Sequence, residues 1–167
     1  MRLTTSDYSN RSGGPLAGRS DSLRPQVLGR QRLEWIMLQI LLVEDNPADV
    51  LMVREALRSS RIAAYLMIAS DGEQALKLLN EGQFKLDFII LDLAMPKFDG
   101  FTVLQNYHTR NGPPVVVFTN SSSEQEKKLA LALGAADFVR KPMGFRSYIN
   151  AVRGIVERWS GATAADY

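Results

Sequence analysis

Polar residues that could bind a metal ion or a phosphate group follow four short runs of this sequence that are expected to form strands. Three runs are apolar, Leu38–Val43, Phe88–Leu91 and Val115–Phe118, and the fourth is Asp137–Arg140. Glu44 and Asp45 follow the first run, Asp92 the second, Thr119 the third and Lys141 the fourth. In open α/β sheets, ligands bind at the carboxyl ends of the strands, so these side chains are expected to converge on one crevice.

Three carboxylates in one pocket repel one another unless a cation is present. Mg²⁺ suits such a pocket, because it takes one or two carboxylates, keeps several waters and accepts a phosphate oxygen. Lys141 and the hydroxyl of Thr119 could hold phosphoryl oxygens, which would equip Asp92 to become an aspartyl phosphate. Taken singly, each residue has a plainer interpretation: a loop-capping Asp, solvated acids, a hydroxyl near a helix, or a surface lysine.

The apolar runs read as strands buried on both faces, which is typical of a parallel sheet covered by helices. A further strand is predicted at Ala64–Ala69. Helices are predicted from Pro47 to about Ser59, from Ser70–Glu73 to Gly82, from about Gly100 to Thr109, from about Glu124 to Gly134, and from about Gly144 to Ser160. Asn46, Pro47 and Asp49 favour the first helix start. The order (βα)₅ predicts an α/β, doubly wound, three-layer domain.

Two of these helices are expected to begin with a capping box, one formed by Ser70 with Glu73 and the other by Ser123 with Glu126. Two interruptions of the chain support the element boundaries. Pro96 forbids continuation of the strand Phe88–Leu91, and Asp99-Gly100 supplies a turn before the next helix.

Composition excludes several classes of protein. The chain has 167 residues, 46% of them hydrophobic, and no cysteine, so disulfides and thiolate sites are ruled out. No apolar run could span a bilayer, the N-terminus lacks the apolar core of a signal peptide, and the cytoplasm is the expected location. No Gly-rich nucleotide-binding loop is present. The only histidine, His108, is expected to have no functional role.

Residues 1–36 form a basic extension that is expected to be disordered at least to about residue 28. Six Arg and three acidic residues give this extension a net charge of +3. Because the whole chain has a net charge of +2, the remaining residues carry −1, so nucleic-acid binding by the domain is not indicated. Apolar residues between Val27 and Met37 leave open a short docked segment or a translation start at Met37. The expected division is 1–36, a domain at 37–160, and a short tail at 161–167.

The residues at the strand ends resemble the receiver domain of two-component response regulators, also called the CheY-like fold. The motifs are Leu42-Val-Glu-Asp45, Asp92 with Met95-Pro96 and Asp99-Gly100, Phe118-Thr119, and Gly134-Ala-Ala-Asp-Phe-Val-Arg-Lys-Pro142. The resemblance covers about Met37 to Ser160. The phrase Val43-Glu-Asp-Asn-Pro-Ala-Asp-Val50 and a last helix that closes in Trp159 are most similar to small single-domain bacterial regulators that pair with phytochrome histidine kinases.

The resemblance implies a flavodoxin-like five-stranded parallel sheet with strand order 2-1-3-4-5. It also implies that Asp92 is the phosphoacceptor. Glu44, Asp45, Asp92 and the backbone carbonyl of Ala94 would hold Mg²⁺, for which Mn²⁺ could substitute. Thr119 and Lys141 would bind the phosphoryl group, and Phe138 stands at the position of the family's switch aromatic.

Two positions depart from the common pattern of the family. Ala94 is small where a larger polar residue is frequent, which should leave attacking water less obstructed. Asn120 stands where a small residue is common and could crowd or hydrogen-bond the phosphoryl group. The segment from Tyr107 to Gly112 replaces a longer helix and loop. These features are expected to modulate the lifetime of the phosphate and the partner surface.

The expected function is therefore that of a stand-alone regulator, phosphorylated on Asp92 by a histidine kinase or phosphotransfer protein. It would signal by protein–protein contact, without a DNA-binding domain or a membrane. A homodimer would use the face of the helix near Glu124, the strand 137–140 and the last helix. Two alternatives stay open: a phosphorylation-independent adaptor, and an aspartate-nucleophile phosphatase. Ala94 disfavours the phosphatase, which would want a second Asp there, so no enzymatic activity beyond its own phosphorylation and dephosphorylation is expected.

Overall fold

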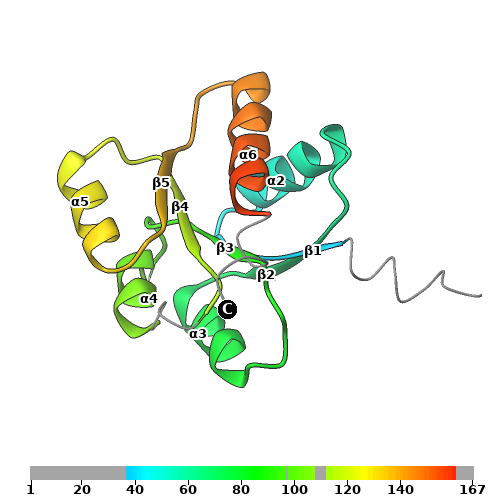
Figure 1. Cartoon of the computed structure of the whole chain (residues 1–167). Coiled ribbons are helices and arrows are strands. Elements are labelled where there is room, and N and C mark those ends of the chain that lie inside the picture. Colours follow the sequence, from blue (N-terminus) through cyan, green and yellow to red (C-terminus); the bar gives the residue numbers. More distant parts are fainter. Residues whose placement is uncertain (1–36, 97, 108–111, 161–167) are drawn as a thin grey trace, which may run out of the picture.

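The protein folds as strands and helices that alternate along the chain (Figure 1). The structure is a computed structural model that describes residues 37–96, 98–107 and 112–160. The strands are β1 (Leu38–Val43), β2 (Ala64–Ala69), β3 (Phe88–Leu91), β4 (Val115–Thr119) and β5 (Asp137–Arg140). The helices are α2 (Pro47–Ser59), α3 (Gly72–Glu81), α4 (Gly100–Asn106), α5 (Glu124–Ala132) and α6 (Phe145–Trp159). The predictions for residues 1–36, His108 and residues 161–167 lie outside the described residues.

All strands pair in parallel, in the order β2-β1-β3-β4-β5. This confirms the doubly wound sheet and the predicted order 2-1-3-4-5. The two central strands, β1 and β3, are in register so that Val43 lies opposite Leu91. The first residues after these strands, Glu44 and Asp92, therefore leave the sheet side by side.

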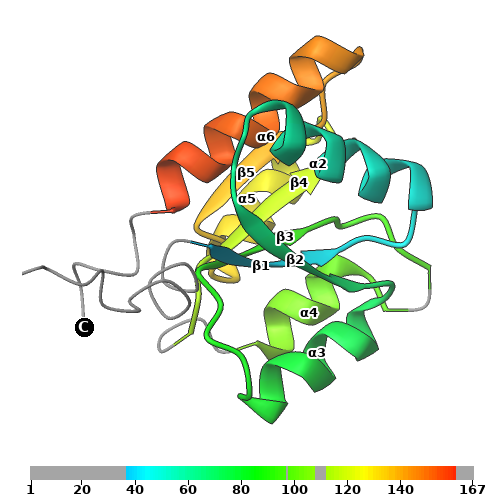
Figure 2. The same ribbon diagram turned by 90° about the vertical axis from the view of Figure 1, so that its right-hand side faces the viewer.

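Two apolar layers hold the helices on the sheet. Alternate strand residues such as Ile40 and Leu42 pack against α2 and α6, whereas Leu41 and Val43 pack against residues of α3, α4 and α5. Figure 2 shows α2 and α6 above the sheet and α3 and α4 below it. Both faces of the central strands are therefore buried, which is why their sequences are continuously apolar. No helix in residues 37–96, 98–107 or 112–160 is long and apolar enough to cross a membrane.

The first helix start agrees with the prediction, and the second does not. In α2, Asn46 caps the helix by accepting the N–H of Ala48, and Pro47 occupies the first turn. The predicted capping box of Ser70 with Glu73 is wrong by one residue: Asp71 is the cap and accepts the N–H of Gln74 at 2.8 Å. Gln74 in turn accepts the N–H of Ser70 at 2.7 Å. Asp71 directly follows Ser70, and its carboxylate caps the helix in place of the Ser70 hydroxyl.

The predicted capping box at α5 is confirmed in one half. Ser123 accepts the N–H of Glu126 at 3.3 Å. The N–H of Ser123 itself donates to the hydroxyl of Ser121 at 3.1 Å. In a full capping box this N–H would donate to the Glu126 carboxylate, but here it has a partner within the loop.

Helix α4 is shorter than predicted. It ends at Asn106 because Tyr107 has an extended backbone (φ −96°, ψ 114°). The hydroxyl of Tyr107 lies 3.4 Å from the carbonyl oxygen of Pro113, on the far side of the loop that leads to β4. The Tyr107 side chain thus connects the two ends of this loop. The helix was expected to continue from Tyr107 to Thr109, and this is wrong at Tyr107.

Candidate functional site

Backbone hydrogen bonds hold the two acids at the ends of the central strands. The N–H of Asp92 donates to the carbonyl of Val43 at 3.0 Å, and the N–H of Glu44 donates to the carbonyl of Ala69 at 2.9 Å. Their side chains are buried, with 4% and 3% of each residue exposed. The carboxylates therefore extend from fixed positions at the sheet edge, as predicted.

The loop after Asp92 passes very close to that residue. A Cβ at Gly100 would lie 2.4 Å from the backbone oxygen of Asp92 and 2.8 Å from the Cα of Leu93, so this position requires glycine. The N–H of Gly100 also donates to the carbonyl of Leu93 at 3.1 Å. Nearer the carboxylate, the N–H of Ala94 donates to Oδ1 of Asp92 at 3.2 Å, which leaves Oδ2 for other partners.

Lys141 lies at the centre of an acidic cluster. Its Nζ is 2.7 Å from Oε2 of Glu44, 2.6 Å from Oδ2 of Asp49 and 2.7 Å from Oδ2 of Asp92. An ammonium has three hydrogen-bond donors, so all of them are used. The backbone of Lys141 is held too, because its N–H donates to the carbonyl of Thr119 at 2.7 Å. We call Glu44, Asp49, Asp92 and Lys141 the acid–lysine cluster.

The cluster carries an excess of negative charge. Three carboxylates and one ammonium have a net charge of −2 when all four are ionised. Burial raises the pKa of Glu44, and the charge of Asp92 raises it further, against the opposing effect of Lys141. Burial alone would lower the pKa of Lys141, but the hydrogen bonds that its ammonium donates to Asp49, Asp92 and Glu44 raise it well above its ordinary value. Both shifts mean that the cluster retains protons, as an anionic site should.

The donors of the cluster fit a hard divalent cation. Carboxylate oxygens of Glu44, Asp49 and Asp92 all lie within 4.8 Å of one another, and oxygen is the ligand atom that Mg²⁺ and Mn²⁺ prefer. A divalent cation would also match the net charge of −2. The residues present therefore fit the metal that the sequence predicts.

The group of neighbouring acids differs from the expected set in one residue. Asp45, predicted beside Glu44 and Asp92, is partly buried but does not belong to the group of acids within 4.8 Å, and Asp49 takes its place there. Consecutive side chains at the end of a strand point in different directions, so two adjacent acids do not readily face one centre. Asp49 was expected only to favour the start of α2. Its place in the first turn of a helix that begins at this sheet edge was the signal that sequence reasoning missed.

The other predicted residues lie around the cluster at different depths. Thr119 is fully buried at the end of β4, and its hydroxyl accepts the N–H of Ser121 at 3.4 Å. Phe138 is half-buried on β5 and packs against the apolar layer under α3, α4 and α5. Ala94 and Asn120 are exposed. Thr119 and Phe138 are thus connected to the core, whereas the two expected modulators face solvent.

Tyr148, on α6, is a further polar residue beside the cluster that sequence reasoning missed. Its ring packs edge-on against Phe118, with 5.1 Å between ring centroids, and Nζ of Lys141 lies 6.0 Å from the centre of the Phe118 ring. Burial raises the pKa of the Tyr148 hydroxyl, and the charge of Asp49 raises it further. The sequence offered no signal for it, because helical spacing alone makes Tyr148 a core residue.

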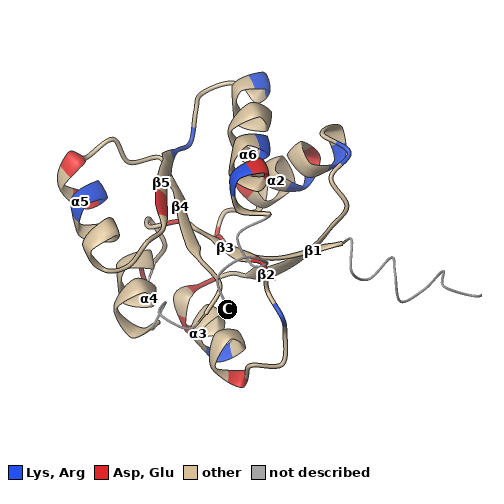
Figure 3. Ribbon diagram, in the orientation of Figure 1, with Lys and Arg blue, Asp and Glu red and all other residues tan. Residues whose placement is uncertain are grey.

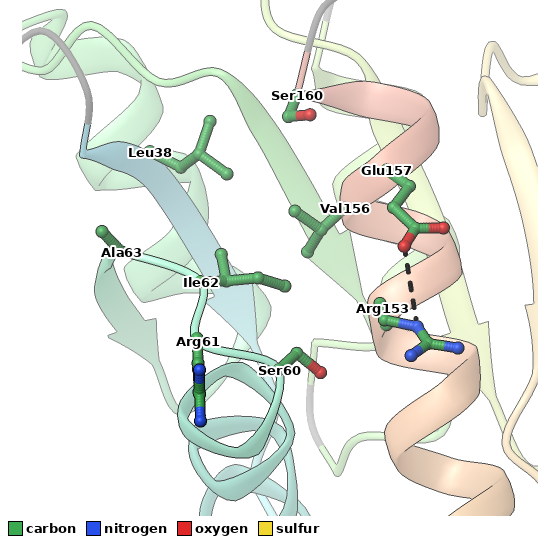
Figure 4. A pocket seen from close by; sticks show the side chains of 9 residues that line it. All are labelled: Leu38, Ser60, Arg61, Ile62, Ala63, Arg153, Val156, Glu157 and Ser160. Atoms are coloured by element: carbon green, nitrogen blue, oxygen red, sulfur yellow. Dashed lines mark ion pairs between the residues drawn. The ribbon is translucent and has the colours of Figure 1, made fainter.

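A groove at the opposite edge of the sheet lacks comparable chemistry (Figure 4). It has a volume of about 480 Å³ and lies between Leu38, the turn after α2, and the end of α6. Leu38 is the first residue of β1 and Glu44 follows its last, so β1 separates this groove from the cluster by about 20 Å. Its charged pair, Arg153 and Glu157, is 3.6 Å apart and exposed. Basic residues of the described chain lie mainly on the helices (Figure 3), which makes the interior position of Lys141 distinctive.

Comparison with known protein families identifies the family of this domain. Residues 40–153 match the model of the response regulator receiver domain. The chain belongs to this family. The matched segment contains the whole acid–lysine cluster, and it confirms the family that the strand-end motifs predicted.

Several solved receivers resemble this one. The Mn²⁺-bound form of response regulator Rcp1 is 33% identical, with a TM-score of 0.64, over 73% of this receiver chain and 94% of that one. The phosphorylated cyanobacterial phytochrome response regulator RcpA is 30% identical, with a TM-score of 0.68, over 75% of this chain and 96% of that one. Phytochrome-associated regulators are thus among its structural neighbours, as the sequence suggested.

The curated relatives that match this chain include proteins about twice as long as the matched segment. The transcriptional regulatory protein CpxR of Escherichia coli (strain K12) is 35% identical over 126 residues, which are 74% of this chain and 52% of that protein. The receiver chain therefore spans about half the length of the curated relatives of this kind that it matches. The shared half is the receiver.

Proposed function

We propose that Asp92 accepts a phosphoryl group from a phosphohistidine of a kinase or phosphotransfer protein. A carboxylate oxygen of Asp92 forms a bond to phosphorus while the bond between phosphorus and the imidazole nitrogen breaks. The imidazole leaves with the electron pair and takes up a proton from solvent. The observation that carries this proposal is the buried Asp92 carboxylate at the end of a central strand, 2.7 Å from Nζ of Lys141.

The surrounding residues have separate roles in this proposal. Lys141 and the hydroxyl of Thr119 bind phosphoryl oxygens and balance their charge. Glu44, Asp45, Asp92 and the carbonyl of Ala94 would hold Mg²⁺, directly or through water, with Mn²⁺ as a substitute, while Asp49 stays with Lys141 in the unphosphorylated protein. The Mn²⁺-bound form of the similar regulator Rcp1 supports a divalent ion. When bound, the ion supplies positive charge to the phosphoryl oxygens.

Two exposed residues are proposed to set the lifetime of the phosphate. The N–H of Ala94 donates to the Asp92 carboxylate, and the small Ala94 side chain leaves room for water to approach the acyl phosphate. Asn120 follows the buried Thr119 and carries an amide that could contact the phosphoryl group. The protein would catalyse no reaction beyond its own phosphorylation and dephosphorylation.

The phosphorylated protein is proposed to act by contact with other proteins. Phe138 would shift with Thr119 and remodel the surface of α5, β5 and α6. This surface exposes apolar side chains at Leu129, Leu131 and Phe145, which suits a partner or a second copy of the chain. Similarity to RcpA and to the bacteriophytochrome response regulator AtBRR supports a phytochrome-type histidine kinase as the donor, acting in the cytoplasm.

Phosphorylation by acetyl phosphate tests the proposal. With Mg²⁺, the wild type should gain the mass of one phosphoryl group in intact-mass spectrometry, and Asp92→Asn should gain none. Asp99→Asn is the matched control, because Asp99 is an exposed acid in the following loop, and it should be labelled like the wild type. A chelator should abolish labelling. Equal labelling of Asp92→Asn and wild type, or none in any variant with BeF₃⁻ also failing to bind, would refute the proposal.

A further inference from the structure

The hydroxyl of Tyr148 is a buried polar group for which the roles above give no purpose. Tyr148 is 5% exposed, and its oxygen has no hydrogen-bond partner among the described residues. Buried hydroxyls almost always have a partner, because an unpaired one is costly. This hydroxyl therefore suggests a partner that becomes available in another state of the protein.

The surroundings of Tyr148 indicate which group that partner is. The Phe118 ring neighbours both groups: its centroid is 5.1 Å from that of the Tyr148 ring and 6.0 Å from Nζ of Lys141. Among the neighbouring charges, that of Asp49 has the largest effect on the pKa of Tyr148 and raises it. In the unphosphorylated protein Oδ2 of Asp49 accepts from Lys141 at 2.6 Å instead.

Lys141 has no free donor for a phosphoryl group. Its three donors serve Glu44, Asp49 and Asp92. Phosphorylation of Asp92 removes that carboxylate charge and releases one donor, but a phosphoryl group presents three strong acceptor oxygens. A second oxygen can be served only if Lys141 leaves one of the other two carboxylates.

Exposure decides which carboxylate Lys141 can leave. The side chain of Glu44 is 2% exposed, so without Lys141 its charge would be stranded in the interior. The side chain of Asp49 is 19% exposed, so water can solvate part of its charge. Asp49 is therefore the less costly partner to give up, and a hydrogen bond from another donor would reduce the cost further.

We propose that Asp49 holds Lys141 in the unphosphorylated protein, and that the hydroxyl of Tyr148 replaces Lys141 on Asp49 when Lys141 turns to the phosphoryl group. Only hydrogen bonds are exchanged. Asp49 and Tyr148 are positioning residues that act through Lys141, and this inference rests on the proposed role of Asp92. It makes the helices α2 and α6 contributors to the stability of the phosphorylated state.

The binding of BeF₃⁻, a stable mimic of the phosphoryl group, tests this exchange in saturating Mg²⁺ by calorimetric titration. Tyr148→Phe should weaken BeF₃⁻ binding by about ten- to hundredfold, the loss of one hydrogen bond to a charged group in the bound state. Asp49→Ala should strengthen it, because Lys141 gains a free donor and a competing charge disappears. In the Asp49→Ala background, Tyr148→Phe should have no further effect.

Thermal unfolding without BeF₃⁻ and Mg²⁺ separates this role from a structural one. Tyr148→Phe should leave the unfolding temperature equal to or above that of the wild type, because the hydroxyl has no partner in that state. Tyr65→Phe, an exposed tyrosine on β2, is the matched control and should change neither measurement.

Each contrary result has a distinct meaning. A lower unfolding temperature with unchanged BeF₃⁻ affinity in Tyr148→Phe would show a structural hydroxyl and overturn the exchange. Weaker binding of both Mg²⁺ and BeF₃⁻ in Asp49→Ala would make Asp49 a metal ligand and overturn it as well. If the wild type itself does not bind BeF₃⁻, the proposed function of Asp92 fails first.

Discussion

Replacement of Lys141 by Met tests whether one ammonium balances the acid–lysine cluster. Met keeps an unbranched apolar stem, so the main change is the loss of a charge 2.6 to 2.7 Å from three carboxylates. Those carboxylates lie within 4.8 Å of one another. At an effective dielectric constant of about 20, two unit charges 4.8 Å apart repel by about 3.5 kcal/mol.

Protonation limits this repulsion and sets the size of the effect. Holding a proton on a carboxyl of ordinary pKa costs about 4 kcal/mol at pH 7, close to the repulsion of one pair. We therefore expect the variant to take up at least one proton on folding and to lose about 3 to 5 kcal/mol at pH 7. Because the folded variant then binds more protons than the unfolded chain, its stability falls as pH rises above about 4, by about 1.4 kcal/mol per pH unit for each extra proton.

Urea unfolding in the presence of a chelator, followed by circular dichroism at pH 5 and pH 7, measures this effect. The loss relative to wild type should be larger at pH 7 by about 2 to 3 kcal/mol. Lys128→Met, an exposed lysine on α5, is the control and should change stability by no more than about 0.5 kcal/mol. A loss in Lys141→Met that is equal at both pH values, or below about 1 kcal/mol at pH 7, would refute the charge-balance argument.

Three further predictions concern the frame of the site. Gly100→Ala should lower the free energy of unfolding by about 2 kcal/mol or more, because its Cβ would lie 2.4 Å from a backbone oxygen. Gly154→Ala, in α6 with open space around it, should raise the free energy of unfolding by up to about 1 kcal/mol; thermal unfolding measures both. Asp71→Ala should cost about 1 kcal/mol as the loss of a helix cap and Ser70→Ala less; the reverse order would show that the cap is misassigned. Burial raises the pKa of Glu44, so the folded protein retains a proton that the unfolded chain releases, and stability should fall as pH rises from 4.5 through the raised value. Glu44→Gln should flatten that part of a stability-against-pH profile; an unchanged slope would contradict the assignment.

The fold could be predicted almost entirely, and the physical reason is the sheet. Strands such as β3 are buried on both faces, so their sequences are continuously apolar, and the buried acid Asp92 directly follows the last strand residue. The parallel order of strands then brings Glu44, Thr119 and Lys141 to the same edge. Those residues could be found because topology alone determines where they lie.

The errors arose where neighbouring residues compete for one position. Ser70 and Asp71 are both good helix caps, and only the backbone of the loop decides between them. Tyr107 fits a helix by pattern, but its position is determined by the chain beyond it, where its hydroxyl approaches Pro113. Such choices depend on the geometry of loops that no periodicity in the sequence encodes.

Asp49 and Tyr148 show a different limit of sequence reasoning. They reach the cluster from the helices that cover one face of the sheet, and a helix presents only some of its residues there, at an angle set by packing. The strand-end residues are constrained by the sheet, whereas these helix residues are not, so topology predicts the first group and misses the second. If the exchange between Lys141 and Tyr148 on Asp49 occurs, the covering helices are where the energy difference between the two states is tuned, with the fold unchanged.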